Sequence, residues 1–231
     1  MAAISTWLSD PARPADDRSR DATSKPAELL AFFGIAPGIT VLDLNAATGW
    51  YTEILARVVG PNGHVIAHNH PGARNTLPAE AFEARYGNQR LPNVEQLFVR
   101  HNDLSLPPGS VDVVLMSMVY HDTYWHRDGV DWGPIDRPLL LESLHAALKP
   151  GGIVGVVDHY AAAGRDPFES VMAVHRIDPA VVRRDFVAAG FEPDGESDAL
   201  RNCGDDYSSS VFDAAVVGRT DRFVLRFRKP R

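Results

Sequence analysis

The fold of this chain is decided by residues 40–53, which read Thr40-Val41-Leu42-Asp43-Leu44-Asn45-Ala46-Ala47-Thr48-Gly49-Trp50-Tyr51-Thr52-Glu53. An apolar run broken only by Asp43 is typical of a parallel strand that is covered on both faces. Small residues follow, where a backbone could come close to a ligand. Apolar residues then recur at helical spacing until Gly60-Pro61. The stretch predicts a strand, a tight turn and a helix, either as a ligand-binding loop or as an ordinary turn of an α/β protein.

Alternating strand and helix signals continue along the chain. A helix is predicted over residues 26–33, with Ser24 as its N-cap. Further strands are expected at 65–67, 94–99, 111–116 and 153–157, and helices at 139–148 and from Pro179 onward, after an Asp178 cap. Such units imply a parallel sheet with right-handed crossovers. The last two strands, 191–197 and 223–227, lack a long helix between them and should form an antiparallel hairpin at one edge.

Length and composition favour one globular domain. The 231 residues are enough for a sheet with helices on both faces. Residues 1–24 are polar, and we expect them to form a loosely structured arm or a short helix on a single domain of residues 25–231. The chain is 45% hydrophobic and 23% charged, and no apolar run approaches the length of a membrane span. We therefore expect no membrane partner.

Charge and cysteine content restrict the possible partners further. The net charge is −7, and basic residues cluster only at the tip, 226–231. Nucleic acid is therefore a disfavoured partner, because its phosphates demand a basic face. The single cysteine, Cys203, cannot form an internal disulfide. The first ten residues lack the basic start and apolar core of a signal peptide, so a cytoplasmic location is expected.

Polar side chains gather just after the predicted strands, at the edge of the sheet where ligands bind in this architecture. Residues 120–126, after the fourth strand, hold the densest cluster, which includes His121, Asp122 and Tyr124. A histidine beside an aspartate can act as a general base, because the carboxylate fixes the imidazole tautomer. The alternative is a capped loop whose aromatic rings pack on the sheet.

His159 and His175 extend this cluster. His159 follows the fifth strand, so we expect His121 to lie within reach of His159 or His175, at the mouth of a substrate pocket. Together with Asp122 these histidines could ligate zinc or iron. No pair has the i, i+4 spacing that makes a metal motif specific, and we predict no metal.

The residues after the first strand resemble motif I of the class I S-adenosylmethionine-dependent methyltransferases. That motif has an acidic residue, here Asp43, followed by a Gly-x-Gly-x-Gly pattern, of which Asn45 and Ala47 replace two glycines and Gly49 remains. The three-glycine pattern of dinucleotide-binding dehydrogenases fits less well. The resemblance extends over residues 10–230 to a bacterial group of predicted methyltransferases, through Val-Tyr-His-Asp-Thr-Tyr-Trp, Leu-Lys-Pro-Gly-Gly, His-Arg-Ile-Asp and Asp-Arg-Phe-Val segments.

The resemblance implies a Rossmann-like, seven-stranded methyltransferase fold with S-adenosylmethionine as cofactor. It places the backbone of residues 45–49 at the methionine moiety, Asn69 at the ribose and Asp103 at the adenine. The expected activity is methylation of a small molecule, with His121 as base or substrate-orienting residue and Asp122, Tyr124, His159 and His175 beside it. Two alternatives stay open: another reaction on the same fold (lyase, isomerase or hydrolase) carried by the histidines, or a non-catalytic ligand-binding module.

Overall fold

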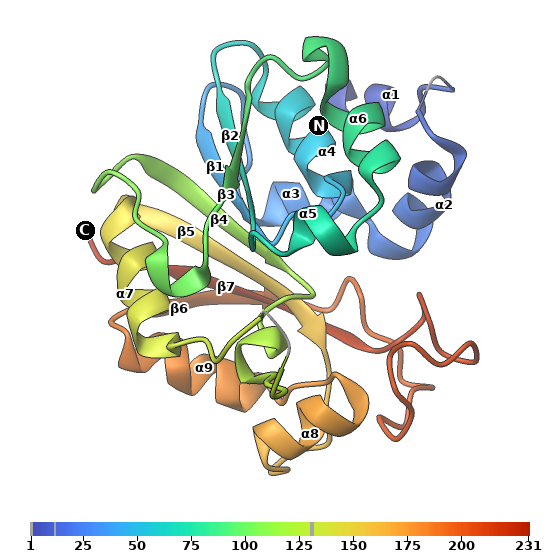
Figure 1. Cartoon of the computed structure of the whole chain (residues 1–231), viewed down its shortest axis with the longest axis vertical. Helices are drawn as coiled ribbons and strands as arrows, with labels where there is room; N and C mark the ends of the chain where they lie inside the picture. Colours follow the sequence, from blue (N-terminus) through green and yellow to red (C-terminus); the bar gives the residue numbers. More distant parts are fainter. Residues whose placement is uncertain (1, 12, 130–131) are drawn as a thin grey trace.

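The described residues form one seven-stranded sheet in the order β3-β2-β1-β4-β5-β7-β6 (Figure 1). The structure is a computed structural model, which describes residues 2–11, 13–129 and 132–231. The strands are β1 (Thr40–Leu44), β2 (His64–Asn69), β3 (Val94–Phe98), β4 (Val111–Ser117), β5 (Leu148–His159), β6 (Glu192–Ser197) and β7 (Arg222–Arg228). The predicted α/β class and seven strands are confirmed.

Strands β1 to β5 run parallel, and their register brings the ends of β1, β2 and β4 together. Leu42 of β1 pairs with Ile66 of β2 on one side and with Val114 of β4 on the other. β7 is antiparallel to both β5 and β6, so the expected hairpin is present and β6 is the edge strand. The order of strands reverses between β1 and β4, which is where open sheets of this kind bind ligands.

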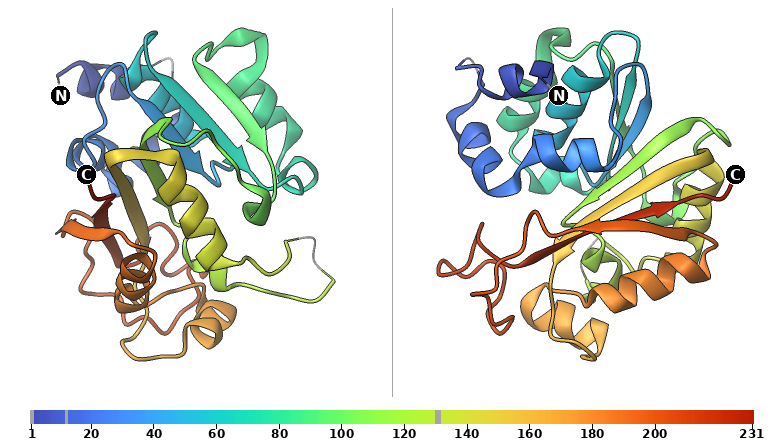
Figure 2. Two further views of the ribbon diagram at one scale, coloured as in Figure 1. Left: turned by 90° about the vertical axis from the view of Figure 1, so that its left-hand side faces the viewer. Right: turned by 180° about the vertical axis from the view of Figure 1, so that it is seen from behind.

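Helices cover both faces of the sheet (Figure 2). One apolar core joins the sheet to α3 (Pro26–Phe32) and α4 (Trp50–Val59), and the other joins it to α7 (Arg137–Ala147) and α9 (Pro179–Ala188). Neighbouring strand residues face opposite cores: Val41 packs in the first and Leu42 in the second. This two-sided burial explains the continuous apolar run of β1.

The N-terminal segment contains two helices, α1 (Ala2–Leu8) and α2 (Ala15–Ser24), where a loose arm or one short helix was expected. α2 lies against the start of α4, because the indole nitrogen of Trp50 donates to the Asp17 carbonyl at 3.3 Å and to Asp21 Oδ1 at 3.2 Å. The predicted N-cap of α3 was wrong. Ser24 ends α2, and Lys25, in the left-handed conformation, precedes α3.

The chain between β6 and β7, residues 198–221, forms a long connection without helix or strand, which we call the β6–β7 segment. It folds back beside α8 (Pro167–Val174), a helix that the sequence analysis did not predict, and the amide of Val211 donates to the carbonyl of Val174. Arg176 is fully buried and holds the segment through Asp205, with nitrogen–oxygen distances of 2.8 and 3.1 Å.

No helix among the described residues is long and apolar enough to cross a membrane.

Candidate functional site

The β1–α4 loop, residues 45–49, has the sharp backbone that its small residues predicted. Asn45, Ala47 and Gly49 adopt φ angles of 56°, 50° and 83°. For residues other than glycine such angles cost about 1–2 kcal/mol each. Asn69, at the end of β2, offsets this cost: its Oδ1 accepts from the Ala47 amide at 2.9 Å, and its Nδ2 donates to the Ala47 carbonyl at 3.1 Å. The loop thus has a conformation typical of glycines, held by one amide side chain.

Gly49 is the point where the loop contacts α6 (Ala79–Tyr86), a helix that the sequence analysis missed. A Cβ atom placed on Gly49 would lie 2.2 Å from Oη of Tyr86, and the backbone angle of 83° is itself unfavourable for other residues. Tyr86 therefore explains, together with φ, why this glycine of the motif remains. Its polar, short helix gave no periodic signal that would have placed it against the loop.

Asp43 lies buried in β1, beneath the loop. Its Oδ2 accepts a hydrogen bond from Thr52 Oγ1 at 2.6 Å, which links β1 to α4. Burial raises the pKa of the Asp43 carboxyl to about 7, against the opposing effects of that hydrogen bond and of the Arg20 charge. A direct contact of Asp43 with a cofactor stays a prediction.

The residues predicted at the ribose and adenine lie in different environments. Asn69 is buried, and its amide already bonds the loop backbone in both directions. Asp103, in the short helix η2 (His101–Asp103), is exposed and makes no side-chain hydrogen bond to another described residue. The buried member of η2 is His101, whose Nε2 lies 2.9 Å from Asn45 Oδ1.

His101 belongs to an aromatic group that the sequence analysis did not predict. Its ring centroid lies 5.1 Å from those of His68 and Trp132, and 6.2 Å from that of His70, which stacks nearly parallel to it. Burial, with smaller effects from His68 and His70, lowers the pKa of His101 to about 3. The ends of β2 and β3 therefore present flat aromatic rings beside the loop, of which His101 is neutral.

The histidines that follow β4 and β5 come together, as predicted. The ring of His121, in η3 (His121–Tyr124), lies 5.9 Å from that of His159 and 5.8 Å from that of His175. His159 and His175 are half-buried. His121 itself is only 5% exposed, so the expectation of an exposed residue at a pocket mouth was wrong. A buried carboxylate, which accepts hydrogen bonds from His121, holds it in this position.

That carboxylate is Asp158, which the sequence analysis did not select as a site residue. It is fully buried at the end of β5, and its two oxygens accept from the backbone amide of His121 at 2.9 Å and from His121 Nδ1 at 2.7 Å. It also accepts from the amide of His159 at 2.8 Å. The sequence signal that could have identified it is an aspartate at the end of an apolar strand, directly followed by a histidine.

Two carboxylates flank His121, because Nε2 lies 3.3 Å from Asp122 Oδ1 on the other side of the ring. Burial alone would lower the pKa of His121, but Asp158 and Asp122 together raise it to about 9. The same burial, outweighed by His121, leaves the pKa of Asp158 below its usual range, while burial raises that of Asp122. For His159 burial dominates and lowers the pKa to about 3.

Tyr124 is not brought into this cluster. Its hydroxyl and that of Tyr120 both donate to Oδ2 of Asp185 on α9, and the guanidinium carbon of Arg137 lies 3.7 Å from the centre of the Tyr124 ring. The structure thus separates Tyr124 from the histidines beside which it was expected.

Within the described ranges, no group of three His, Cys, Asp or Glu residues has a geometry that could hold a metal ion.

Comparison with known proteins gives distant relatives of one kind. No family model matches the chain. The ubiquinone/menaquinone biosynthesis C-methyltransferase UbiE of Vibrio campbellii is 28% identical over 138 residues, which cover 60% of this chain and 48% of that protein. Arsenite methyltransferase of Halobacterium salinarum is 32% identical over 130 residues, which cover 55% of this chain and 29% of that protein. The chain spans less than half the length of these curated relatives.

Solved structures match over nearly the whole chain. A SAM-dependent methyltransferase from Aquifex aeolicus has a TM-score of 0.65 at 21% identity, covering 98% of this chain and 97% of that one. Geranyl diphosphate C-methyltransferase from Streptomyces coelicolor gives 0.64 at 14%, covering 99% and 88%, and the [4+2]-cyclase SpnF gives 0.62 at 18%, covering 96% and 84%. At these identities the likeness shows the fold. The fold is thus that of S-adenosylmethionine-dependent methyltransferases, and the sequence relatives are themselves methyltransferases.

Proposed function

We propose that this protein binds S-adenosylmethionine at the carboxyl ends of β1 and β2 and transfers its methyl group to a small molecule. The observation that carries the proposal is the β1–α4 loop. Three residues there adopt left-handed angles, and Asn69 bonds the loop backbone on both sides of Ala47. Such a strained arrangement is expected where a loop has to follow a ligand closely.

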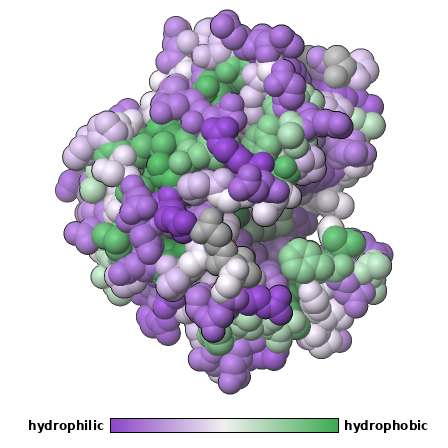
Figure 3. All heavy atoms as spheres, viewed as in Figure 1, coloured by the Kyte–Doolittle hydropathy of each residue, from purple (hydrophilic) through white to green (hydrophobic). Residues whose placement is uncertain are grey.

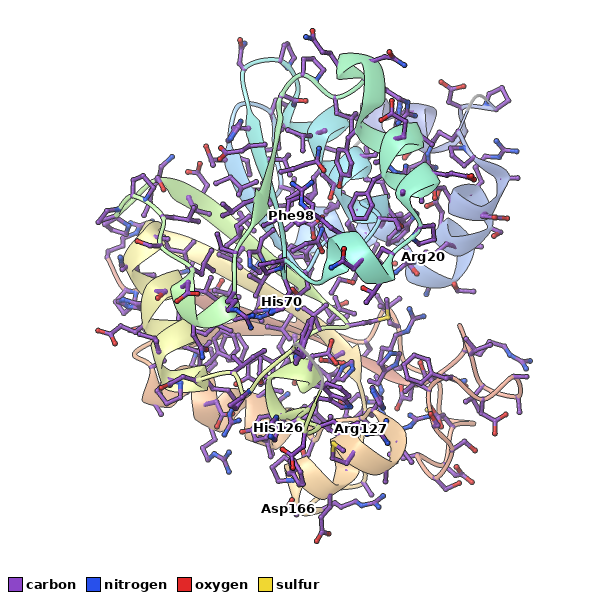
Figure 4. All side chains as sticks on the ribbon, viewed as in Figure 1. Arg20, His70, Phe98, His126, Arg127 and Asp166 are labelled. Atoms are coloured by element: carbon purple, nitrogen blue, oxygen red, sulfur yellow. The ribbon has the colours of Figure 1, made fainter. Side chains whose placement is uncertain are left out.

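The surrounding side chains fit the chemistry of that cofactor. Arg20 of α2 is exposed and rests 4.2 Å above the Trp50 ring, at the start of α4, where its charge suits the carboxylate of the methionine moiety. Figure 4 shows Arg20 and His70 along the lower border of the half that contains β1–β3. Figure 3 shows the surface indented between this border and the β6–β7 segment. The neutral ring of His101, the stacked ring of His70 and the exposed carboxylate of Asp103 suit a nucleobase.

The cofactor would supply an activated methyl group, and the chain would supply alignment of the acceptor. Methyl transfer asks for little beyond positioning, which can by itself contribute most of the rate. The histidine cluster stands at the ends of β4 and β5, on the other side of the strand reversal from Asn69. The acceptor would therefore lie between His121 and the β1–α4 loop. The net charge of −7 favours a small molecule over nucleic acid as that acceptor.

A second candidate is another reaction on the same fold. The buried Asp158–His121 pair favours it, because acid–base machinery of this kind goes beyond what methyl transfer strictly needs. SpnF, a [4+2]-cyclase, has a similar fold. Such an enzyme could bind the same cofactor without consuming it.

Calorimetry with S-adenosylhomocysteine tests the proposed function. We expect binding in the micromolar range, because the Cβ atoms of Asn45 and Ala47 crowd the loop where the family has glycine. Ala47→Gly removes one of them and the left-handed strain, so it should bind at least as tightly. Asn69→Ala should bind more weakly. A thermogram without heat at millimolar ligand, for wild type and Ala47→Gly alike, would overturn the proposal.

A further inference from the structure

We infer that Asp158 positions His121 as a general base, and that the methyl acceptor is a weakly acidic hydroxyl group of the phenol or enol kind. The inference rests on the proposed function and narrows it. An acceptor that carries no proton, such as a thioether or a tertiary amine, needs no base at all. The presence of a positioned base therefore discriminates between classes of acceptor.

The geometry of Asp158 supports a positioning role. Two of its three hydrogen bonds hold His121, one at the backbone amide and one at Nδ1, and the third holds the amide of His159. Donation from Nδ1 to a buried carboxylate fixes the tautomer of the ring, so that Nε2 is the nitrogen that exchanges a proton with a ligand. Because Asp158 is inaccessible to solvent, it cannot meet an acceptor itself and would affect the proton transfer through His121.

An acceptor would reach Nε2 beside Asp122, past the partly exposed rings of His159 and His175. The charged and titratable groups that face His121 are Asp122 on η3, Asp158 and His159 on β5, and His175 after α8, with Arg176 and Arg222 farther out, beyond His159. His159 is fixed by a 2.7 Å hydrogen bond between its Nδ1 and Thr220 Oγ1 of the β6–β7 segment. His175 lies under Phe212 of the same segment, with the ring centroids 4.9 Å apart. Both rings are partly exposed, so solvent reaches the cluster there.

The strength of the base matches the proposed acceptor. A base takes a proton readily from a group whose pKa is not far above its own, and a phenol titrates near pH 10, as tyrosine does. With its pKa raised to about 9 by the two carboxylates, His121 is close to that value. Phe212, which is 68% exposed beside His175, offers an aromatic surface for the flat body of such an acceptor.

The step balances without a further reactant. The acceptor O–H bond breaks, its proton moves to Nε2 of neutral His121, and its electron pair stays on oxygen. That oxygen takes the methyl group of S-adenosylmethionine, and the pair of the broken carbon–sulfur bond remains on sulfur as the neutral thioether. His121 then releases the proton to solvent. The neutral form of His121 becomes more abundant as pH rises toward 9, so the step should accelerate over that range.

The first test is a histidine titration followed by NMR, without cofactor. The His121 signal, identified by its loss in His121→Gln, should titrate near pH 9 in the wild type and near or below the ordinary 6.5 in Asp158→Asn. Glu95→Gln is the matched control, since it removes a carboxylate 3.3 Å from the half-exposed His64 at the start of β2. Asp158→Glu, which keeps the charge, should retain a raised value. A His121 signal that titrates identically in wild type and in a folded Asp158→Asn protein overturns the inference.

The second test uses 4-nitrophenol as a probe, with S-adenosylhomocysteine present, and measures the visible absorbance of the phenolate. Wild type and Glu95→Gln should bind the probe as its anion below the pH at which free probe ionises. His121→Gln and Asp158→Asn should not. If S-adenosylhomocysteine binds but the probe stays neutral or unbound, the acceptor class is wrong and the proposed function stands. If S-adenosylhomocysteine itself fails to bind, the proposed function falls, and the NMR titration still decides the role of Asp158.

Discussion

Asn69 and Ala47 exchange two hydrogen bonds across the gap between β2 and the β1–α4 loop. One amide side chain thereby satisfies both backbone polar groups of a residue held at a positive φ. The pairing couples the end of β2 to the loop, so the side chain predicted to hold a ribose also determines the conformation of its neighbour.

Replacing Asn69 should therefore affect stability before any ligand is added. Asn69→Ala leaves the Ala47 amide and carbonyl without partners, at a cost of about 1–3 kcal/mol. Asn69→Asp keeps the acceptor but loses the donor and sets a carboxylate against the Ala47 carbonyl, so we expect a loss here too. Urea denaturation measures both. Stabilities equal to wild type would mean that the loop holds its shape unaided.

Gly49 and Gly38 provide a matched pair for testing the loop. Both have φ near 85°, but a Cβ on Gly38 meets nothing within 4 Å, whereas one on Gly49 would lie 2.2 Å from Tyr86 Oη. Gly38→Ala should lower the free energy of unfolding only by the cost of a positive φ at a residue other than glycine, about 1–2 kcal/mol. Gly49→Ala should cost more, and Tyr86→Phe, by removing the nearest atom, should recover part of the difference. Equal costs for the two alanines would contradict the contact with Tyr86.

The sequence predicted the central strands of the sheet well because they are buried on both faces. The apolar run 41–44 and the strand at 111–117 have this two-sided burial, whereas β3 at 94–98 is an edge strand with exposed and half-buried residues. Helix α6 was missed, and α2 was expected only as one form of a loose N-terminal arm, because ion pairs hold these helices in place of an apolar stripe. Arg85 of α6 bonds both Asp17 of α2 and the buried Glu53. The spacing of apolar residues predicts a helix from sequence, whereas ion pairs between residues far apart in the chain leave no such pattern.

The site was predicted in part for a related reason. Strand ends meet whatever their separation in sequence, so the approach of His121 to His159 and His175 followed from topology. The orientation of the side chains did not follow from topology. Tyr124 turns to Asp185 on α9, and Asp158 turns inward to His121, because each carboxylate meets a donor that only the packed structure supplies.

Asp43 should make stability depend on pH. Its pKa is about 7 in the folded chain against 3.8 in the unfolded chain, so the folded state holds the proton over that interval. The stability of the wild type should therefore fall as pH rises from about 4 to 7, relative to Asp43→Asn, by about 4 kcal/mol at most. Urea denaturation of both proteins at several pH values measures this. Asp103→Asn, which changes an exposed carboxylate, should follow the wild type, and parallel curves for wild type and Asp43→Asn would contradict a buried, proton-holding Asp43.

Arg176 should anchor the β6–β7 segment from inside the molecule. Its side chain and that of Asp205 are both essentially inaccessible, and the guanidinium also donates to the carbonyls of Ser209 and Tyr160. Arg176→Met leaves a buried carboxylate unpaired, which should cost about 3–5 kcal/mol. Hydrogen exchange should then accelerate across residues 198–221, while β1 and β2 stay protected. Arg183→Met removes the exposed ion pair with Glu196 and should cost less than about 1 kcal/mol. If exchange in the segment is as slow in Arg176→Met as in Arg183→Met, the segment is held by its own turns and not by the buried pair.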